Sequence, residues 1–182
     1  MTDVLNKPRD WNEYQEMLAQ LDLTLAFLDA GVLVEIEPTI PSTMRKTDAL
    51  LLVGGASVYC EMTSPRLSVS PQSAGESQDV KRVIRHLQPK VTRQLPAPSH
   101  GLLAMDTTKC GLFSHDVRVI AAAVIPHHRN LLGICLWSWE GDDDDFSFKT
   151  PTVLLSHSST LHLGLARQVA NLLKAPLELA DF

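Results

Sequence analysis

The feature that most constrains the fold of this chain is a pair of glycines flanked by apolar residues, in the stretch DALLLVGGASVYCEMT at 48–63. Adjacent glycines suit a two-residue β-hairpin turn, because both turn positions need positive φ. With Gly54-Gly55 as the turn, the register of the whole hairpin follows, and Asp48 lies opposite Glu61. The sequence therefore predicts two carboxylates side by side on one face of a sheet.

Two opposed carboxylates repel each other, because directly opposed β-carbons are only about 4.5 to 5.5 Å apart. A hard cation such as Mg²⁺ or Mn²⁺ can compensate, since it binds a few carboxylate oxygens together with water and substrate phosphate. The same register places Lys46 opposite Thr63, which adds a positive charge near the acids. Two alternatives stay open: the strands fray beyond Leu50 and leave both acids in water, or a three-residue loop changes the register.

A second amphipathic pattern, at 79–95, predicts a helix with one strongly basic face. Apolar residues recur at helical spacing on one side, and Pro89 is expected to kink the helix or split it. The other side carries Arg82, His86, Lys90 and Arg93, with Gln94 beside them. This face is the part of the chain best suited to contact nucleic-acid phosphates.

The remaining pattern predicts helices alternating with strands, and hence an α/β fold. Asp10 and Glu13 match a capping box that starts a helix at Trp11, whose inward stripe is expected to include Leu25 and Leu28. Further helix is expected at 161–174. Strands are expected at 32–37, 101–106, 117–125 and 131–139, with a Ser- and Pro-rich loop at 63–78 and a connecting loop at 126–130.

Composition limits the class of protein. The 182 residues are 45% hydrophobic and 20% charged, which fits a single globular domain over 1–182. No apolar run approaches the roughly 18 residues of a membrane-spanning helix, and the N-terminus lacks the pattern of a secretory signal. We therefore expect a cytoplasmic protein with no membrane partner. The net charge of -5 excludes a generally positive surface, so any contact with nucleic acid must be local.

Two further groups of residues have ordinary interpretations. Cys60, Cys110 and Cys135 are odd in number and far apart, so we expect buried free thiols rather than disulfides or zinc ligands. The acidic run at 141–145 is most simply a solvated turn, because it lacks the glycine and final glutamate of an EF-hand loop.

The chain resembles the PD-(D/E)XK, or restriction-endonuclease-like, nuclease superfamily in the order of its elements. These are a helix, a strand, Asp48, the hairpin, Glu61, the basic helix and a buried strand. The resemblance covers roughly residues 11 to 106 and implies a central mixed sheet flanked by helices, with an α-β-β-β-α-β core. It also implies metal-dependent phosphodiester hydrolysis, with Asp48 and Glu61 holding Mg²⁺ or Mn²⁺. The family's lysine position is occupied by Thr63, so the resemblance leaves Lys46 and Lys90 as the candidates to supply the missing charge.

Three functions follow as hypotheses. The first is an active metal-dependent nuclease, and the second is a nuclease-fold domain that binds nucleic acid or a protein partner without cleavage. The third is a hydrolase that uses the serines and histidines of 156–162, although no nucleophile-elbow glycine pattern accompanies them.

Overall fold

Seven strands form one mixed sheet in a computed structural model that describes residues 11–65, 76–95, 99–107, 114–137 and 153–181. Their spatial order is β1-β4-β5-β6-β7-β8-β9, and β2 and β3 form a separate two-stranded sheet. The strands are β1 (Leu33–Ile36), β2 (Thr39–Ile40), β3 (Arg45–Lys46), β4 (Ala49–Val53), β5 (Ala56–Thr63), β6 (His100–Asp106), β7 (Leu131–Trp137), β8 (Val153–Ser156) and β9 (Leu177–Leu179). The helices are α2 (Trp11–Asp29), α3 (Glu76–Gln94), α4 (Ser114–Val124) and α5 (Leu163–Leu172), with a short 3-10 turn, η1, at Ile125–His127.

Strand directions follow from the connections. β4 is antiparallel to both of its neighbours, β1 and β5, whereas β5, β6 and β7 are parallel because α3 and α4 connect them as crossovers. β8 is antiparallel to β7, and β9 is parallel to β8. The carboxyl ends of β5, β6 and β7 therefore meet at one edge of the sheet, which is where open α/β sheets usually bind ligands.

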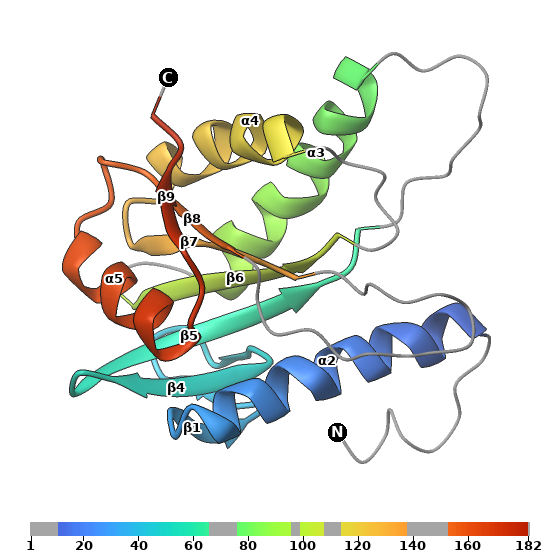
Figure 1. Ribbon diagram of the computed structural model, residues 1–182. Coiled ribbons are helices and arrows are strands. Elements are labelled where there is room, and N and C mark those ends of the chain that lie inside the picture. The colour runs from blue at the N-terminus through green and yellow to red at the C-terminus, as the bar shows by residue number, and fades with distance from the viewer. Residues whose placement is uncertain (1–10, 66–75, 96–98, 108–113, 138–152, 182) are drawn as a thin grey trace.

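Helices cover both faces of the sheet, and each face has its own apolar core. α2 and α5 pack on one face, and α3 and α4 pack on the other. Figure 1 shows α3 and α4 above the sheet and α2 below it. This three-layer arrangement confirms the expected α/β class with a mixed sheet flanked by helices. Among the described residues, no helix is long and apolar enough to cross a membrane.

The buried side of α2 differs from the expected one. Ala19, Leu23 and Phe27 face the core, whereas Leu25 and Leu28 are 46% and 57% exposed. The helix has apolar residues on both sides, so periodicity alone could not select the buried one. The capping interaction proposed for Asp10 and Glu13 lies outside the described side chains.

The segment expected to be a strand at 117–125 is the helix α4, followed by η1. Val117, Ile120, Ala121 and Val124 are buried, with the spacing of one helical face. Tertiary structure outweighs the strand preference of Val and Ile here, because a crossover must connect the parallel strands β6 and β7.

The other expected elements agree with the structure within one to three residues, and β8 and β9 were not anticipated. α3 runs unbroken through Pro89, so the expected split does not occur. Cys60 and Cys135 are buried free thiols, as expected. Cys110, residues 66–75 of the expected loop and the acidic run at 141–145 lie outside the described residues.

Candidate metal and phosphodiester site

The hairpin of β4 and β5 has the predicted two-residue turn. Gly54 and Gly55 have φ values of 56° and 83°, and Val53 pairs with Ala56. The same register continues to Ala49 and Cys60, so Asp48 lies across from Glu61. The Asp48 backbone N–H donates to the Cys60 carbonyl over 3.1 Å, so the chain is still paired at Asp48 and the acids are not frayed into water.

The two carboxyl groups share a buried environment. Glu61 is only 2% exposed, and its pKa is raised to about 7 by burial first and by the neighbouring Asp48 charge second. Burial also raises the pKa of Asp48, although its Oδ2 accepts a 2.6 Å hydrogen bond from the Met62 backbone N–H. Each carboxylate charge disfavours ionisation of the other. The acids therefore compete for a proton in the metal-free protein.

Lys90 supplies a cation to this acid pair from helix α3. Its Nζ lies 2.7 Å from Oε1 of Glu61, and the lysine side chain is 27% exposed. Val83, Leu87 and Val91 are buried in the core beside α3's lysine and so fix the position of Lys90 over β5. Of the two candidate lysines, the structure brings Lys90 to the acids.

Lys46 does not lie opposite Thr63, so that expectation is wrong. The chain leaves the main sheet before Asp48, and Lys46 pairs with Thr39 in the two-stranded sheet. Its Nζ lies 3.7 Å from Oε2 of Glu37 at the surface. Thr63 instead has its hydroxyl 3.0 Å from Nε2 of His86 on α3.

One oxygen of the acid pair has no partner among the described residues. Oε2 of Glu61 is buried and accepts no hydrogen bond there. Burying a carboxylate oxygen without a hydrogen-bond partner is energetically unfavourable, so such an oxygen is suited to bind a ligand. The described residues contain no group of three or more His, Cys, Asp or Glu side chains arranged for a metal. Two carboxylates are nevertheless a common protein contribution to Mg²⁺, which takes its other ligands from water and phosphate.

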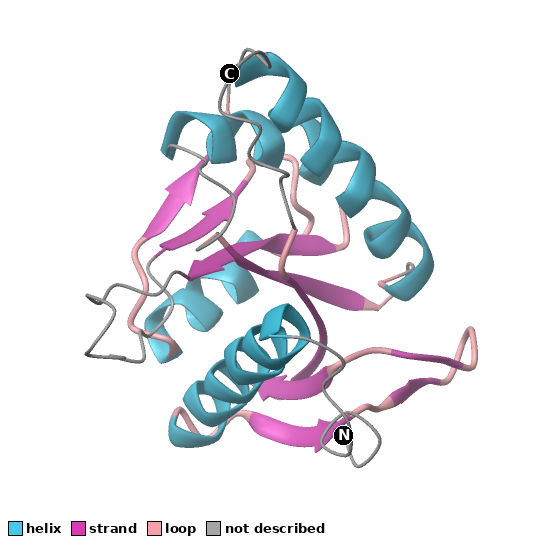
Figure 2. Cartoon of the chain, turned by 90° about the vertical axis from the view of Figure 1, so that its right-hand side faces the viewer, coloured by secondary structure: helices cyan, strands magenta, loops and turns pink. Residues whose placement is uncertain are grey.

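A pocket of about 170 Å³ lies beside Lys90 at the carboxyl ends of the parallel strands, although neither Asp48 nor Glu61 lines it. Lys90 and His86 line it from α3, and Gln20 lines it from α2. Asp106 pairs in register with Trp137 at the strand ends and accepts a 2.6 Å hydrogen bond from the Ser64 hydroxyl. Figure 2 views the molecule from this side, with α2 and α3 on either side of the strand ends.

Sequence reasoning missed Ser64, Asp106 and Trp137. One signal could have found Asp106, because it ends the strand predicted at 101–106 and polar side chains at the carboxyl ends of parallel strands share one edge. Trp137 is buried, and its Nε1 has no hydrogen-bond partner among the described residues.

The predicted basic face of α3 reaches the site only in part. Lys90 and His86 line the pocket, whereas Arg82 and Arg93 are exposed and Gln94 is half-buried. The carbonyl of Arg93 accepts a 3.1 Å hydrogen bond from Nη1 of Arg45, which ties the end of α3 to the β2–β3 hairpin.

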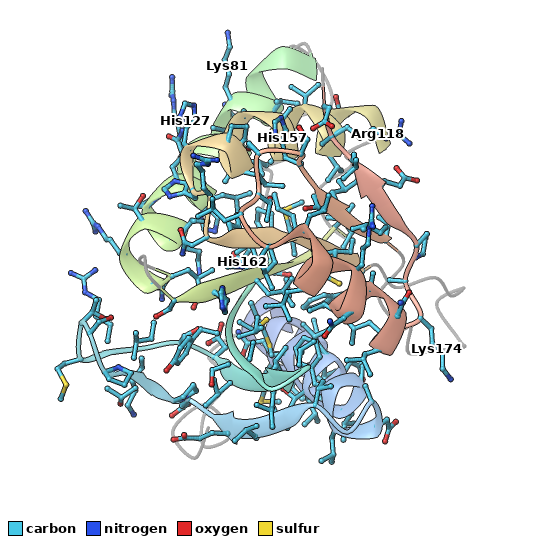
Figure 3. The ribbon with its side chains drawn as sticks, turned by 90° about the vertical axis from the view of Figure 1, so that its left-hand side faces the viewer. Lys81, Arg118, His127, His157, His162 and Lys174 are labelled. Atoms are coloured by element: carbon cyan, nitrogen blue, oxygen red, sulfur yellow. The ribbon has the colours of Figure 1, made fainter. Side chains whose placement is uncertain are left out.

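The serines and histidines near the C-terminus stabilise a turn. His157 Nδ1 lies 2.8 Å from the Ser159 hydroxyl and accepts the Ser159 backbone N–H over 3.0 Å. His157 Nε2 lies 3.5 Å from Oδ1 of Asp181, which also accepts the Ser158 backbone N–H. His157 Nδ1 and Asp181 Oδ1 thus accept hydrogen bonds from backbone N–H groups of the turn. Figure 3 shows His157 on the side opposite to that seen in Figure 2.

Comparison with known proteins gives no match: no family model, no curated protein and no solved structure is significantly similar to this chain.

Proposed function

We propose that this chain is a divalent-metal-dependent phosphodiesterase that acts on nucleic acid. The observation that carries the proposal is the 2.7 Å contact between Lys90 and Glu61. It places a lysine beside the two acids, where the nuclease superfamily keeps the lysine that Thr63 replaces. The chain order α2, β1, β4, β5, α3, β6 supports the same assignment, because it matches the α-β-β-β-α-β core expected from the resemblance.

Asp48 and Glu61 would hold the metal, and the unpartnered Oε2 of Glu61 fits that role. A bound Mg²⁺ or Mn²⁺ would acidify a water molecule and stabilise the charge that develops on the phosphate. Lys90, partly exposed at the pocket wall, would neutralise a phosphate oxygen and orient the attacking water. The exposed cations Arg82 and Arg93 would contact neighbouring phosphates of the same strand.

Metal binding would also displace a proton from the acid pair. Burial and the Asp48 charge raise the pKa of Glu61 to about 7, so some of the molecules hold a proton there at neutral pH. A cation needs the deprotonated carboxylate, which couples its affinity to pH. Calorimetry with Mn²⁺ at pH 7 should therefore show a heat that depends on the ionisation enthalpy of the buffer. Glu61→Gln and Asp48→Asn should abolish the heat, and no heat from the unaltered protein would refute the metal site.

Cleavage is tested with single- and double-stranded DNA and RNA in the presence of Mn²⁺. We expect Lys90→Met to lower the rate by about 100-fold or more, since single preorganised electrostatic groups are typically worth 10² to 10³ in rate. Lys81→Met is the matched control, because Lys81 is an exposed lysine of the same helix. Equal rates for the two variants would exclude Lys90 from the reaction.

A second candidate is a nuclease-fold domain that binds nucleic acid or a protein without cleaving. The same ion pair favours it, because Lys90 already neutralises Glu61 without any metal. Binding of nucleic acid that weakens with salt, without Mn²⁺ heat or cleavage, would establish this function in place of the first.

A further inference from the structure

The β2–β3 hairpin projects from the body of the protein next to the site. In Figure 2 it is the narrow pair of strands at the lower right, beside the lower end of α3. Although each strand has only two residues, the hairpin is held in place at its base. Ile40 is fully buried, and the Thr47 backbone N–H and hydroxyl donate to the carbonyls of Pro38 and Cys60. Arg45 binds the Arg93 carbonyl, so the tip is a fixed projection.

Met44 at the tip of this hairpin is unfavourable for folding in two ways. Its φ is 55°, in the left-handed region where glycine is preferred. Its side chain is also 79% exposed, so the thioether gains little from packing. The turn accounts for the backbone conformation, because the Met44 backbone N–H donates to the Ile40 carbonyl over 2.8 Å and closes the hairpin loop. The exposed apolar side chain has no such role in the fold, and it is the feature that suggests binding.

Two cations adjoin this apolar tip. Arg45 and Lys46 follow Met44 directly; Arg45 binds the carbonyl of Arg93 at the end of α3, and Lys46 lies 3.7 Å from Glu37. An apolar side chain beside cations matches the way in which proteins wedge between base steps of a duplex while holding its phosphates. Protein interfaces more often use a Trp, Tyr or Arg anchor, with charges depleted around it.

A Met44 side chain inserted between base pairs would lie close to the reacting phosphate. Met44 is four residues before Asp48, which is at most about 14 Å of extended chain. Since a duplex rises about 3.4 Å per base along each strand, this reach corresponds to about four base pairs.

We propose that the β2–β3 hairpin is a second nucleic-acid-binding element that inserts Met44 between stacked bases of duplex DNA, within about four base pairs of the phosphate at Asp48 and Glu61. This inference rests on the proposed function for its substrate. The hairpin would favour duplex over single-stranded substrates, because insertion of Met44 requires stacked bases that it can separate.

The test compares Met44→Gly with Lys174→Gly. Lys174 has the same left-handed backbone, with a φ of 54°, and is also exposed. Figure 3 shows it at the edge of the molecule opposite the hairpin. Binding of a 5′-labelled duplex is followed by fluorescence anisotropy in EDTA, with Glu61→Gln in every protein so that cleavage plays no part. We expect Met44→Gly to weaken binding at least tenfold and Lys174→Gly to leave it within twofold.

Two further measurements separate a wedge from a structural role. Met44→Gly and Lys174→Gly should both match or exceed the parent in urea midpoint, because each relieves a left-handed residue. Met44→Asn, which also tolerates this backbone, should lose affinity like Met44→Gly. A 2-aminopurine placed within four base pairs of the cleavage position should brighten when the parent protein binds and stay dark with Met44→Gly.

Equal affinity of the parent, Met44→Gly and Lys174→Gly would overturn the inference and leave the proposed function standing. So would equal affinity of the parent for single strands and duplexes. Conversely, a selective loss with Met44→Gly in a protein that shows neither Mn²⁺ heat nor cleavage would support the hairpin and refute the nuclease. A protein that binds no duplex, DNA or RNA, would overturn the hairpin inference, while the Mn²⁺ heat would still report on the site.

Discussion

Replacing Glu61 by glutamine should make the metal-free protein more stable at alkaline pH, although the substitution removes the proposed metal ligand. Glutamine has nearly the shape of a protonated glutamate and carries no charge. The effect should therefore measure what ionisation of this buried carboxyl costs the fold.

The magnitude follows from the pKa shift. Burial and the Asp48 charge raise the pKa of Glu61 from 4.5 to about 7, even with Lys90 beside it. The folded state therefore holds this proton more tightly than the unfolded state. The contribution to stability is present below pH 4.5 and is lost as the pH rises to and beyond 7. A shift of about 2.5 units corresponds to about 3 kcal/mol at 1.36 kcal/mol per unit.

The assay is urea unfolding in EDTA at a series of pH values from 5 to 8.5, for the unaltered protein and Glu61→Gln. Asp22 also titrates in this range, because burial raises its pKa to about 6, and the difference between the two proteins removes its contribution. Burial also raises the pKa of Asp48, and because Asp48 competes with Glu61 for a proton, its response to the substitution is part of the measured difference. We expect similar free energies of unfolding near pH 5, and an advantage of about 3 kcal/mol for Glu61→Gln above pH 8.

Metal should reverse this order. At a Mg²⁺ or Mn²⁺ concentration of about 1,000 times its dissociation constant, the unaltered protein should gain about 4.1 kcal/mol at pH 8, and Glu61→Gln should gain nothing. A difference between the two proteins that is the same at pH 5 and pH 8 would refute the reasoning, because the carboxyl would then not change its proton affinity on folding.

Three substitutions test the packing of the fold, each by urea unfolding. Leu23→Ala should cost about 2 to 5 kcal/mol, whereas Leu25→Ala should cost much less, because only Leu23 is buried; equal losses would mean that α2 is turned the other way. Gly133→Ala should be strongly destabilising, because a β-carbon would clash with the Leu155 carbonyl oxygen between β7 and β8. An unchanged urea midpoint would show that these strands separate easily.

The hairpin was predictable because its turn chemistry is local. The pair Gly54-Gly55 fixes the register, and the register alone places Asp48 across from Glu61. The failure with Lys46 has a definite cause, because the same counting assumes that the strand continues past Asp48. The Thr47 hydroxyl and backbone N–H instead bind Cys60 and Pro38, and the chain turns away into β3.

The approach of Lys90 to Glu61 depends on how α3 docks, which no local pattern specifies. The family resemblance left Lys90 as one of two candidates, and the packing of Leu87 and Val91 against the sheet selects it. The same limit explains the errors in α2 and α4. α2 has apolar residues on both sides, and the strand preference of α4 conflicts with the crossover that the parallel strands require.

The separation of Lys90 from Glu61 along the chain affects how relatives of this protein can be recognised. A scan for an acid, any residue and a lysine passes over Glu61-Met62-Thr63, because the cation stands 29 residues from the acid. Evolution can lengthen or shorten the connection between β5 and α3 without separating the charges, provided that α3 keeps its place on the sheet. A search pattern for distant homologues should therefore join an acid-flanked glycine hairpin to a lysine on the next helix and leave the spacing free.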